Sequence, residues 1–484
     1  MSADANQPLD MSADLFIGGS WIKGNGGSRP NVDPGNGSTV GTVTTADAEQ
    51  VKNAVDAASA AFPSWSSTIP SKRGSILKEA ARLLAARSEA SAVLLVETGK
   101  TQADARGEIQ RAIDTLLWNG EQAGRVHGTI FPGISDASTR RSTPTSLGVV
   151  VAITAWNFPA VLIARKLGAA LAAGCTVVLK ASDFCPATAR ILIEVLVEAG
   201  LPDGVVNLLF GESPAVAEQL LASPKVKALT FTGSTAVGKK LAALAAPNLI
   251  RPVMELGGHA PVIVWEDADV EHVIATTSRA KFGSAGQSCV ALSRYFVHES
   301  LYRDFVDALV KKAESFTLGH GNDGGVTLGA VAHQGRIDVL DALVRDAEAR
   351  GAVVETGGGR VDRPGFYYRP TVLSGVSADA EIMFEEPFGP ICAVVPVSDL
   401  DTTIELANSA QYSFAAYLFT DSLAVRNAVV TGLDASNIGI NQLAPSLPDV
   451  PLGGLGNSGY GYEGGLEGIL AFTQLRLVSE TAHG

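Results

Sequence analysis

A thiol and a carboxylate, each on a glycine-rich turn, are the two groups in this sequence best suited to covalent chemistry. Cys289 ends the stretch Phe282-Gly-Ser-Ala-Gly-Gln-Ser-Cys, and Glu255 lies in Met254-Glu-Leu-Gly-Gly at the end of an apolar run. Glycine lets other backbone approach closely, and a thiol beside a carboxylate forms a nucleophile with its base. A lone cysteine is more often a small buried apolar residue. On these two motifs alone, both interpretations stand.

The elements that must position these groups alternate between strand and helix from residue 148 onward. Runs of β-branched apolar residues are typical of strands buried on both faces, and they alternate here with segments that have apolar residues at three- and four-residue spacing. This order predicts a doubly wound parallel sheet, which binds ligands at the carboxyl ends of its strands. The predicted strands are 149–154, 176–180, 205–210 and 228–232, and the predicted helices include 46–62, 72–87, 101–124, 159–173, 186–199, 214–222 and 234–246.

Polar residues at two strand ends are suited to nucleotide binding, although the usual G-x-G-x-x-G fingerprint is absent. The segment Phe231–Gly238 joins a strand directly to a helix, where Gly233 permits close approach and Ser234 caps the helix, leaving amide donors for a phosphate. Lys180 and Asp183 follow another strand, where a carboxylate can accept from a ribose hydroxyl. Each signal is weak alone, because ordinary strand–helix junctions and solvated loop charges have the same pattern.

Asn157 lies in Ala155-Trp-Asn-Phe-Pro, between an apolar strand and a helix begun by proline. Its amide can point into the crevice and stabilise an oxyanion, a role worth about 3–4 kcal/mol per donor. A plain helix cap is an equally good interpretation of the same residue.

Composition limits the class of protein. The 484 residues are 46% hydrophobic and 18% charged, which predicts a globular chain of two or three domains. A net charge of −13 without a Lys/Arg cluster argues against a nucleic-acid partner. The sequence has no apolar run of about 18 residues and no signal-peptide pattern, so we expect no membrane association and a cytoplasmic location. The four cysteines have no metal-ligand spacing, and no metal is expected.

Seven motifs, in this order along the chain, resemble those of the NAD(P)-dependent aldehyde dehydrogenase superfamily. They are Ala155–Pro159, Val178–Lys180, Phe231–Thr235, Met254–Gly258, Gly286–Cys289, Glu385–Pro390 and Pro451–Gly454. The resemblance covers nearly the whole chain, from Trp21 to Leu477. Within the superfamily, Met254–Pro261 and the stretch from Asn441 to Gly461 most resemble the succinate and 2-oxoglutarate semialdehyde dehydrogenase branch.

The resemblance implies an α/β architecture in three parts. Residues 1–124 and 146–254 would form an NAD(P)-binding domain with a doubly wound parallel sheet, and residues 255–470 would form an α/β catalytic domain. Residues 125–145 and 471–484 would form a small oligomerisation hairpin, with the strand near 473–478 lent to a neighbouring subunit. A homodimer or homotetramer is therefore expected.

The resemblance also implies roles for single residues. Cys289 would attack the carbonyl carbon of a small-molecule aldehyde, Asn157 would help to hold the oxyanion, and Glu255 would activate water to hydrolyse the thioester. Relatives that pass the acyl group to coenzyme A tend to lack this acid, so Glu255 favours a free carboxylic acid as product. The residues implied in cofactor binding are Trp156, Lys180, Asp183, Gly233, Ser234, Gly238, Leu256, Glu386 and Phe388.

The substrate side departs from the semialdehyde branch. That branch commonly binds the distal carboxylate with two arginines; Arg165 matches one, but Gly283 stands where the other would be. Because a lost guanidinium weakens carboxylate recognition, we expect an aromatic or bulky aldehyde rather than succinate semialdehyde. Ser446 is a further candidate substrate contact. Asp183 stands where Glu accompanies NAD and small residues accompany NADP, so NAD should be preferred; Asp is shorter than Glu and leaves room for NADP as well.

Three other interpretations remain. The protein could be a dicarboxylic semialdehyde dehydrogenase, a catalytically silent relative used for binding, or a thiol esterase that needs no NAD. Silent relatives typically lose Cys289, Glu255 or Asn157, and all three are present here.

Overall fold

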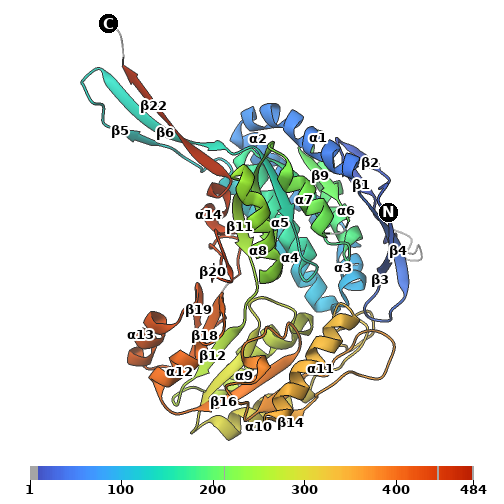
Figure 1. Ribbon diagram of the computed structural model, residues 1–484, viewed down its shortest axis with the longest axis vertical. Helices are drawn as coiled ribbons and strands as arrows, with labels where there is room; N and C mark the ends of the chain where they lie inside the picture. Colours follow the sequence, from blue (N-terminus) through green and yellow to red (C-terminus); the bar gives the residue numbers. More distant parts are fainter. Residues whose placement is uncertain (1–8, 212, 444–445, 482–484) are drawn as a thin grey trace.

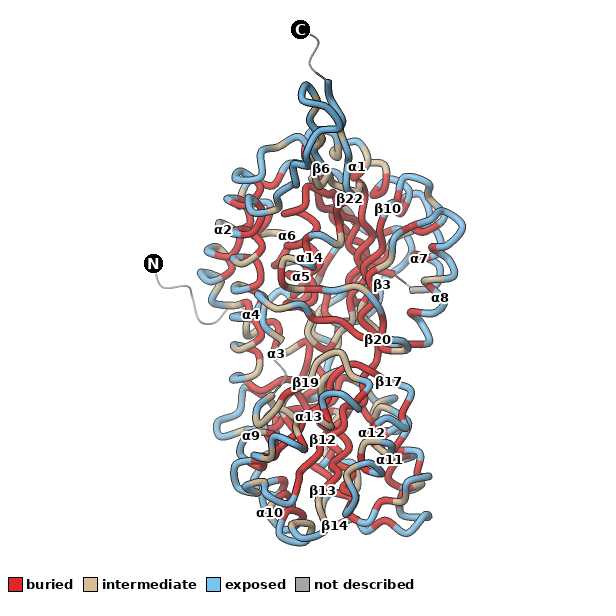
Figure 2. The backbone as a smooth tube through the Cα atoms, turned by 90° about the vertical axis from the view of Figure 1, so that its left-hand side faces the viewer, coloured by how far each residue is buried: buried red, intermediate tan, exposed pale blue. Residues whose placement is uncertain are grey.

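The body of the protein has an upper and a lower region, and each contains a sheet with its own buried core (Figure 1). The computed structural model describes residues 9–211, 213–443 and 446–481. The ends of the predicted first domain and of the oligomerisation hairpin, residues 1–8 and 482–484, lie outside the described residues. Figure 2 shows buried backbone gathered in an upper and a lower region, with exposed segments around both. The predicted α/β fold is confirmed.

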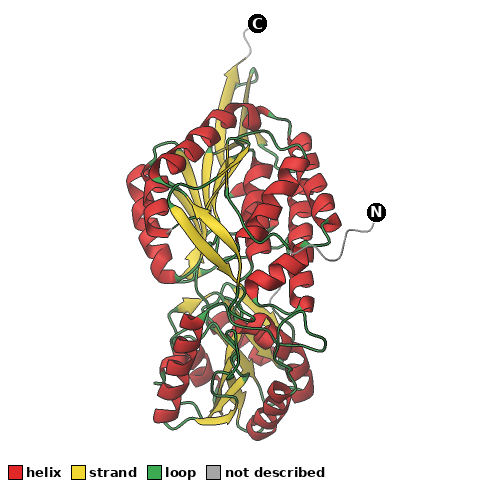
Figure 3. Cartoon of the chain, turned by 90° about the vertical axis from the view of Figure 1, so that its right-hand side faces the viewer, coloured by secondary structure: helices red, strands yellow, loops and turns green. Residues whose placement is uncertain are grey.

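Among the described residues, the upper sheet has eight strands, and five neighbouring strands are parallel. These five are the predicted alternating strands together with the one that ends at Glu255. Helices cover both faces of the sheet (Figure 3). In spatial order the strands are β2 (Ser20–Ile22), β1 (Leu15–Ile17), β9 (Val206–Leu209), β8 (Thr176–Lys180), β7 (Val149–Ile153), β10 (Val226–Thr232), β11 (Arg251–Glu255) and β21 (Gly459–Tyr460).

The helices around the upper sheet follow the predicted pattern, and glycine or serine marks several of their ends. Gly174, with φ of 88°, ends the helix after β7, and Ser234 caps the helix after β10 by accepting from the Val237 amide at 3.4 Å. The helices are α1 (Ala48–Ser67), α2 (Pro70–Ala86), α3 (Ala90–Thr98), α4 (Gln102–Gln122), α5 (Pro159–Ala173), α6 (Pro186–Glu198), α7 (Ser213–Ala222), α8 (Thr235–Ala245) and α14 (Gly465–Leu470).

Within the part of the chain that the structure describes, the lower sheet has seven strands and is mostly parallel. Its order is β14 (Val353–Thr356), β15 (Thr371–Ser374), β16 (Ile391–Val397), β13 (Leu292–His298), β12 (Ala260–Val264), β18 (Ala415–Phe419) and β19 (Asn437–Ile440). The helices beside it are α9 (Val270–Phe282), α10 (Tyr302–Glu314), α11 (Gln334–Ala349), α12 (Leu400–Ala407) and α13 (Leu423–Gly432).

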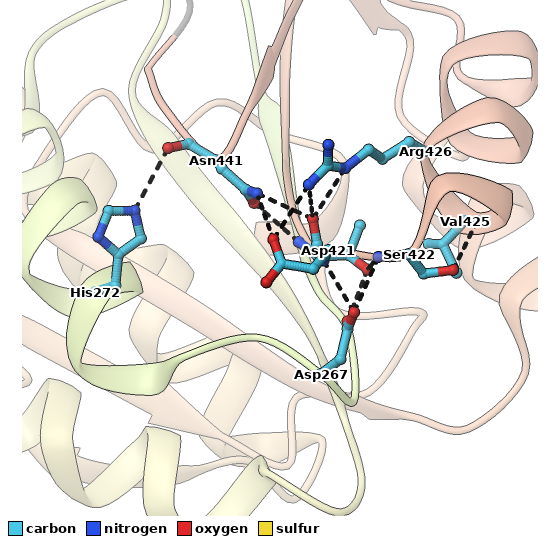
Figure 4. Close-up of polar contacts among 8 residues, drawn as sticks. Asp267, His272, Asp421, Ser422, Val425, Arg426 and Asn441 are labelled. Atoms are coloured by element: carbon cyan, nitrogen blue, oxygen red, sulfur yellow. Dashed lines mark hydrogen bonds and ion pairs between the residues drawn. The ribbon is translucent and has the colours of Figure 1, made fainter.

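A brace of polar residues ties the ends of three strands of the lower sheet (Figure 4). Asp267, just after β12, accepts from the Thr420 hydroxyl at 2.7 Å and from the amides of Asp421 and Ser422 at 2.9 and 3.0 Å. The side-chain amide of Asn441 accepts from the Thr420 N–H at 3.0 Å and donates to the Thr420 carbonyl at 3.0 Å. Asn441 has φ of 52°, a left-handed conformation that asparagine tolerates. The brace therefore holds the end of β19 against the end of β18.

A three-stranded sheet projects from the upper domain (Figure 1). β6 (Ser138–Ser146) pairs on one side with β5 (Thr129–Phe131) and on the other with β22 (Thr473–Thr481) of the same chain. Two further small pairs are β3 (Gly27–Val32) with β4 (Thr39–Thr45), and β17 (Tyr412–Ser413) with β20 (Leu455–Gly456). The predicted hairpin at 125–145 is present.

The C-terminal part of the chain does not follow the predicted boundary at residue 470. β21 extends the upper sheet by pairing with β11, and α14 packs against α5. Ile469 and Phe472 lie in the upper core, at 0% and 3% exposure. Residues 459–470, which the sequence placed with the catalytic domain, therefore lie with the upper sheet, because β21 extends that sheet and Ile469 enters its core.

Candidate active site

The Cys289 loop begins with a strained turn. α9 ends at Phe282, and in the short turn Gly283–Gly286 both Ser284 and Ala285 have positive φ, at 50° and 53°. Such conformations cost roughly 1–3 kcal/mol each for non-glycine residues and persist where the surroundings hold them. Here the Ser284 amide donates to Asp104 at 3.2 Å. The strained turn delivers Cys289, which is partly exposed.

The Cys289 and Glu255 motifs meet directly. Glu255 ends β11 opposite Gly459 of β21, is 4% exposed, and has an Oε1 atom without a hydrogen-bond partner. A Cβ on Gly258 would collide with the carbonyl of Cys289. Only glycine permits this approach, so the paired glycines after Glu255 bring the two loops together, as the sequence predicted.

Asn157 reaches toward the same loop. Its Nδ2 donates to the Gln287 carbonyl at 3.1 Å, and the side chain is 8% exposed. The N-cap position of α5 is Phe158, and no side chain caps that helix. The helix-cap interpretation of Asn157 is therefore wrong: its amide crosses to the Cys289 loop.

A buried ion pair that sequence reasoning missed holds Asn157 from behind. Lys100 pairs with Glu108 and donates to the backbone carbonyl of Asn157 at 2.6 Å. Glu108 also accepts from the Ala160 amide at 2.9 Å, which joins α4 to the first turn of α5. With Lys100 and Glu108 at 3% and 0% exposure, the pair fixes the backbone from which the Asn157 amide projects.

Burial and like charge raise the pKa of the central groups. Burial, followed by the charges of Glu255 and Glu386, raises the pKa of the Cys289 thiol to about 12, and Arg165 opposes this rise. Burial and the charge of Glu463 raise the pKa of Glu255 well above its usual value. Burial raises the pKa of Glu386 to about 8. A carboxyl with a raised pKa is, once ionised, a stronger base than an ordinary carboxylate.

A second buried pair lies behind Glu255 and was also missed. Lys166 of α5 forms an ion pair with Glu463 and donates to the Thr230 hydroxyl of β10 at 3.0 Å. Lys166 is fully buried and Glu463 is 6% exposed. The charge of Lys166 opposes the rise in the pKa of Glu255, and the charge of Glu463 increases it. A lysine within the apolar stretch 159–173 was the available signal, since lysine is almost never buried unpaired.

At the junction of β10 and α8, the residues predicted to receive a pyrophosphate lie together. Ser234 is exposed, and Gly233 precedes it at the end of the strand. A Cβ on Gly238 would collide with the Leu256 side chain, so α8 packs closely on the segment after Glu255. The first turn of α8 presents free amides at a strand end, which is an arrangement suited to phosphate.

Lys180 and Asp183 are linked and are not simply two solvated loop charges. Lys180 Nζ lies 3.3 Å from Asp183 Oδ1, which also accepts from the Gly211 amide at 3.0 Å. Arg29 NH1 lies 3.9 Å from the other carboxylate oxygen. Lys180 is 4% exposed, and Asp183 is partly exposed.

The residues predicted at the nicotinamide end also lie near the Glu255 loop. Glu386 Oε1 accepts from the Gly258 amide at 3.2 Å. The rings of Trp156 and Phe388 meet edge-on with centroids 5.5 Å apart, and Phe388 has φ of 45°. Glu386 is partly exposed as a residue.

The predicted substrate residues divide into a contacting pair and a separate position. Arg165 donates to the Ser446 carbonyl and hydroxyl at 2.9 and 2.7 Å. A Cβ on Gly283 would lie 3.7 Å from Asp104 Oδ1 and 4.0 Å from Arg279 Cγ. Gly283 therefore stands beside a carboxylate, and Arg165 stands beside Ser446.

Among the described residues, no group of three or more His, Cys, Asp and Glu side chains is arranged to hold a metal ion. None of the described helices combines the length and the apolar character needed to cross a membrane.

Comparison with known proteins decides the family. The sequence model described as "Aldehyde dehydrogenase family" matches residues 21–478. This chain belongs to the aldehyde dehydrogenase family. The enzyme is an aldehyde-oxidising oxidoreductase of a family that uses NAD or NADP.

Relatives of this aldehyde dehydrogenase include enzymes named for different substrates. A 4-(hydroxymethyl)benzenesulfonate dehydrogenase of Comamonas testosteroni is 39% identical over 471 residues, covering 97% of this chain and 98% of the relative. The NADP-dependent succinate-semialdehyde dehydrogenase of Escherichia coli is 35% identical over 463 residues, covering 95% and 96%. A solved succinate-semialdehyde dehydrogenase from Burkholderia pseudomallei has a TM-score of 0.96 and 34% identity, covering 99% of this chain and all of the other.

Proposed function

We propose that this aldehyde dehydrogenase oxidises an aromatic or otherwise bulky aldehyde to the free carboxylic acid through covalent catalysis at Cys289, with NAD as the preferred cofactor. The observation that carries the proposal is the convergence of Asn157, Glu255 and Cys289. The Asn157 amide bonds to the Cys289 loop, and Gly258 of the Glu255 motif contacts Cys289 itself.

The proposed reaction begins at the thiol. Burial and the neighbouring carboxyls keep Cys289 protonated at neutral pH, so a base must take its proton before or during attack on the aldehyde carbon. Glu255 is the nearby carboxyl with the strongly raised pKa, and it is suited to take that proton. The amide of Asn157 and the backbone N–H of Cys289 would then hold the oxyanion of the thiohemiacetal.

Hydrolysis of the acyl group would use the same carboxyl. Glu255 would first release to solvent the proton that it took from Cys289. It then has one oxygen without a hydrogen-bond partner, and that oxygen can accept a proton from an attacking water. The water oxygen bonds to the thioester carbon, the carbon–sulfur bond breaks, and the sulfur leaves as the Cys289 thiolate. The buried Lys166–Glu463 ion pair lies beside Glu255.

Residues of this chain fit an NAD(P) molecule along the carboxyl ends of the upper strands. Lys180 and Asp183 would hold the adenosine ribose, the amides after Gly233 the pyrophosphate, and Glu386 the nicotinamide ribose. Trp156, Gly238, Leu256 and Phe388 would shape the surrounding surface. When bound, NAD(P) supplies the hydride acceptor that the conversion of a thiohemiacetal to a thioester requires.

The substrate preference rests on the surroundings of Gly283. A second arginine is missing there, and the carboxylate of Asp104 lies 3.7 Å from the position of a Cβ on Gly283. That carboxylate would repel the distal carboxylate of a short semialdehyde. The 39%-identical relative has a sulfonated aromatic ring in its name, which favours an aromatic substrate here as well.

The projecting sheet is proposed as the oligomerisation surface. Leu475, Leu477, Ile130 and Ile134 on or beside its strands are between 64% and 84% exposed. Exposed apolar residues on a projecting strand favour contact with a second copy of the chain, as a dimer or tetramer. Leu475→Lys together with Leu477→Lys should lower the mass measured by analytical ultracentrifugation, and an unchanged mass would refute this role.

The test of the function is NADH or NADPH production at 340 nm with a panel of aldehydes, using Cys289→Ala as control. Turnover of benzaldehyde derivatives that is lost in the variant supports the proposal. Succinate semialdehyde as the best substrate would replace the aromatic proposal by the semialdehyde one. Ester hydrolysis without NAD as the only activity, or no activity with any aldehyde, would favour an esterase or a silent relative.

A further inference from the structure

Arg111 of α4 lies beside the start of α5, and the proposed reaction gives it no role. Arg111 of α4 is exposed, and its guanidinium lies 5.5 Å from the centre of the Phe158 ring. Within the part of the chain that the structure describes, the Arg111 guanidinium forms no hydrogen bond or ion pair with another side chain. An arginine that stacks on an aromatic ring and keeps its donors free is suited to a planar anion.

Arg165 of α5, the helix beside α4, supplies a second unused donor. It is 8% exposed, and its Nε atom is buried without a hydrogen-bond partner, although NH2 bonds to Ser446. A buried donor left unpaired costs free energy that a bound acceptor can recover. Burial lowers the pKa of Arg111. The charge of Glu108 opposes this change, the charge of Arg165 adds to it, and the charge of Asp104 opposes it, so Arg111 lies within electrostatic reach of Arg165 and of two carboxylates.

The packing of α4 on α5 sets the level of these two arginines. Glu108 bonds to the Ala160 amide, and Asn119 Nδ2 lies 2.9 Å from where a Cβ of Gly168 would be, so the two helices run side by side in the same direction. Arg111, one turn after Glu108, therefore lies level with the segment between Phe158 and Arg165. Asn157, which bonds to the Cys289 loop, directly precedes Phe158.

The order of side chains along α5 indicates the shape of the ligand. Phe158 is the N-cap of α5, and its carbonyl accepts from the Leu162 amide at 2.9 Å; Leu162 and Arg165 lie three residues apart on one face of the helix. Starting from Asn157, the apolar side chains Phe158 and Leu162 come first, and the cation Arg165 comes after them. A ligand that fits this order has a flat apolar middle and an anionic far end.

We infer that Arg111 and Arg165 together bind a carboxylate or sulfonate group on the aromatic ring of the substrate, so that the enzyme acts on anionic aromatic aldehydes. This inference rests on the proposed function and deepens it. In this inference Arg111, on α4, binds the anionic group of the substrate together with Arg165. It takes the part of the second arginine that is missing at position 283. A neutral benzaldehyde would leave both guanidiniums without an acceptor.

The test compares Arg111→Gln with Arg106→Gln on benzaldehyde, 4-formylbenzoate and 4-formylbenzenesulfonate. Arg106 is an exposed residue of the same helix, about 140° around its axis from Arg111. The wild type should have a kcat/KM for at least one anionic aldehyde about tenfold or more above that for benzaldehyde, and Arg111→Gln should remove this advantage through KM. Arg106→Gln should leave it unchanged, and the better of the two anions identifies the natural group.

A binding measurement separates this inference from the proposed reaction. Calorimetry with terephthalate and 4-sulfobenzoate on Cys289→Ala, with and without Arg111→Gln, needs no turnover. A loss of affinity of about tenfold in the double variant supports the anion site even if oxidation fails. An equal kcat/KM for benzaldehyde and both anions, or an unchanged affinity in the double variant, would overturn the inference while leaving aldehyde oxidation intact.

Discussion

Charged residues are buried at one end of the candidate active site, the inner end beside Glu255, and exposed at the other, the outer end near Gly283. At the inner end Glu255, Lys166 and Glu463 are at most 6% exposed, and the lysine is paired. At the outer end Arg111 and Arg279 are exposed, and the contact of Arg279 with Asp104 is 3.5 Å long. Removing one partner of a buried pair costs about 3–5 kcal/mol, whereas an exposed pair contributes about 0–1 kcal/mol. The chemistry is therefore fixed by the fold, and the substrate can change at little cost in stability.

Glu255→Gln tests the inner end and should have the largest effect. Turnover should fall by about 10²–10⁴-fold, because the base is lost. The charge of Glu255 raises the pKa of Cys289, so its removal should shift the midpoint of thiol alkylation to lower pH. The measurement is iodoacetamide labelling against pH, beside steady-state kinetics. Turnover within tenfold of the wild type, or a midpoint that moves upward, would contradict the assigned role.

Asn157→Ala should lower kcat by about 10²–10³-fold while KM changes little, because the oxyanion loses one preorganised donor. The variant also loses the 3.1 Å bond to Gln287, so its melting temperature must be recorded. Asn157→Asp is the matched variant, since it keeps the size of the side chain and removes the donor. If the aspartate variant retained wild-type kcat, the oxyanion role would be refuted.

Gly283→Arg addresses the outer end and should raise the kcat/KM for succinate semialdehyde relative to benzaldehyde by about tenfold, but only in combination with Asp104→Asn. In the single variant the new guanidinium would meet the carboxylate of Asp104, 3.7 Å from the Cβ position, and pair with it. Charged hydrogen bonds are worth about 1.5–3 kcal/mol, which sets the scale of the gain. An equal gain in the single variant would show that Asp104 has no part in substrate choice.

Asp183→Ser should produce the smallest change, a gain of about fivefold in the kcat/KM for NADP relative to NAD. The carboxylate repels a 2′-phosphate, but Lys180 and Arg29 lie 3.3 and 3.9 Å from it and weaken that repulsion. The measurement is a pair of cofactor titrations at fixed aldehyde. A wild-type enzyme that already prefers NADP would refute the proposed cofactor preference.

The sequence was sufficient where a residue type and its local turn determine the position. Ser234 caps its helix as predicted, and the glycines after Glu255 make the close approach that their spacing indicated. Sequence also identified the parallel strands, because strands buried on both faces have continuous apolar runs.

Contacts between residues far apart in the chain could not be predicted in the same way. Glu463 lies in a glycine-dense segment, and only the folded chain brings it to Lys166, nearly 300 residues away. The predicted boundary at residue 470 differs from the structure for the same reason. Phe472 packs in the upper core, and nothing in its neighbouring sequence indicates this contact. Arg111 looks like any charged residue of an amphipathic helix until α5 lies beside it.

The edge strand β21 has a consequence for how the enzyme is made. Glu255 ends a strand whose outer neighbour, Gly459–Tyr460, comes about two hundred residues later in the chain. During synthesis at about 5–20 residues per second, the upper sheet must wait on the order of ten seconds or more for that strand. Until it arrives, the edge of β11 is open to other strands, including those of neighbouring nascent chains. A ribosome stalled between β11 and β21 should therefore hold an aggregation-prone nascent chain.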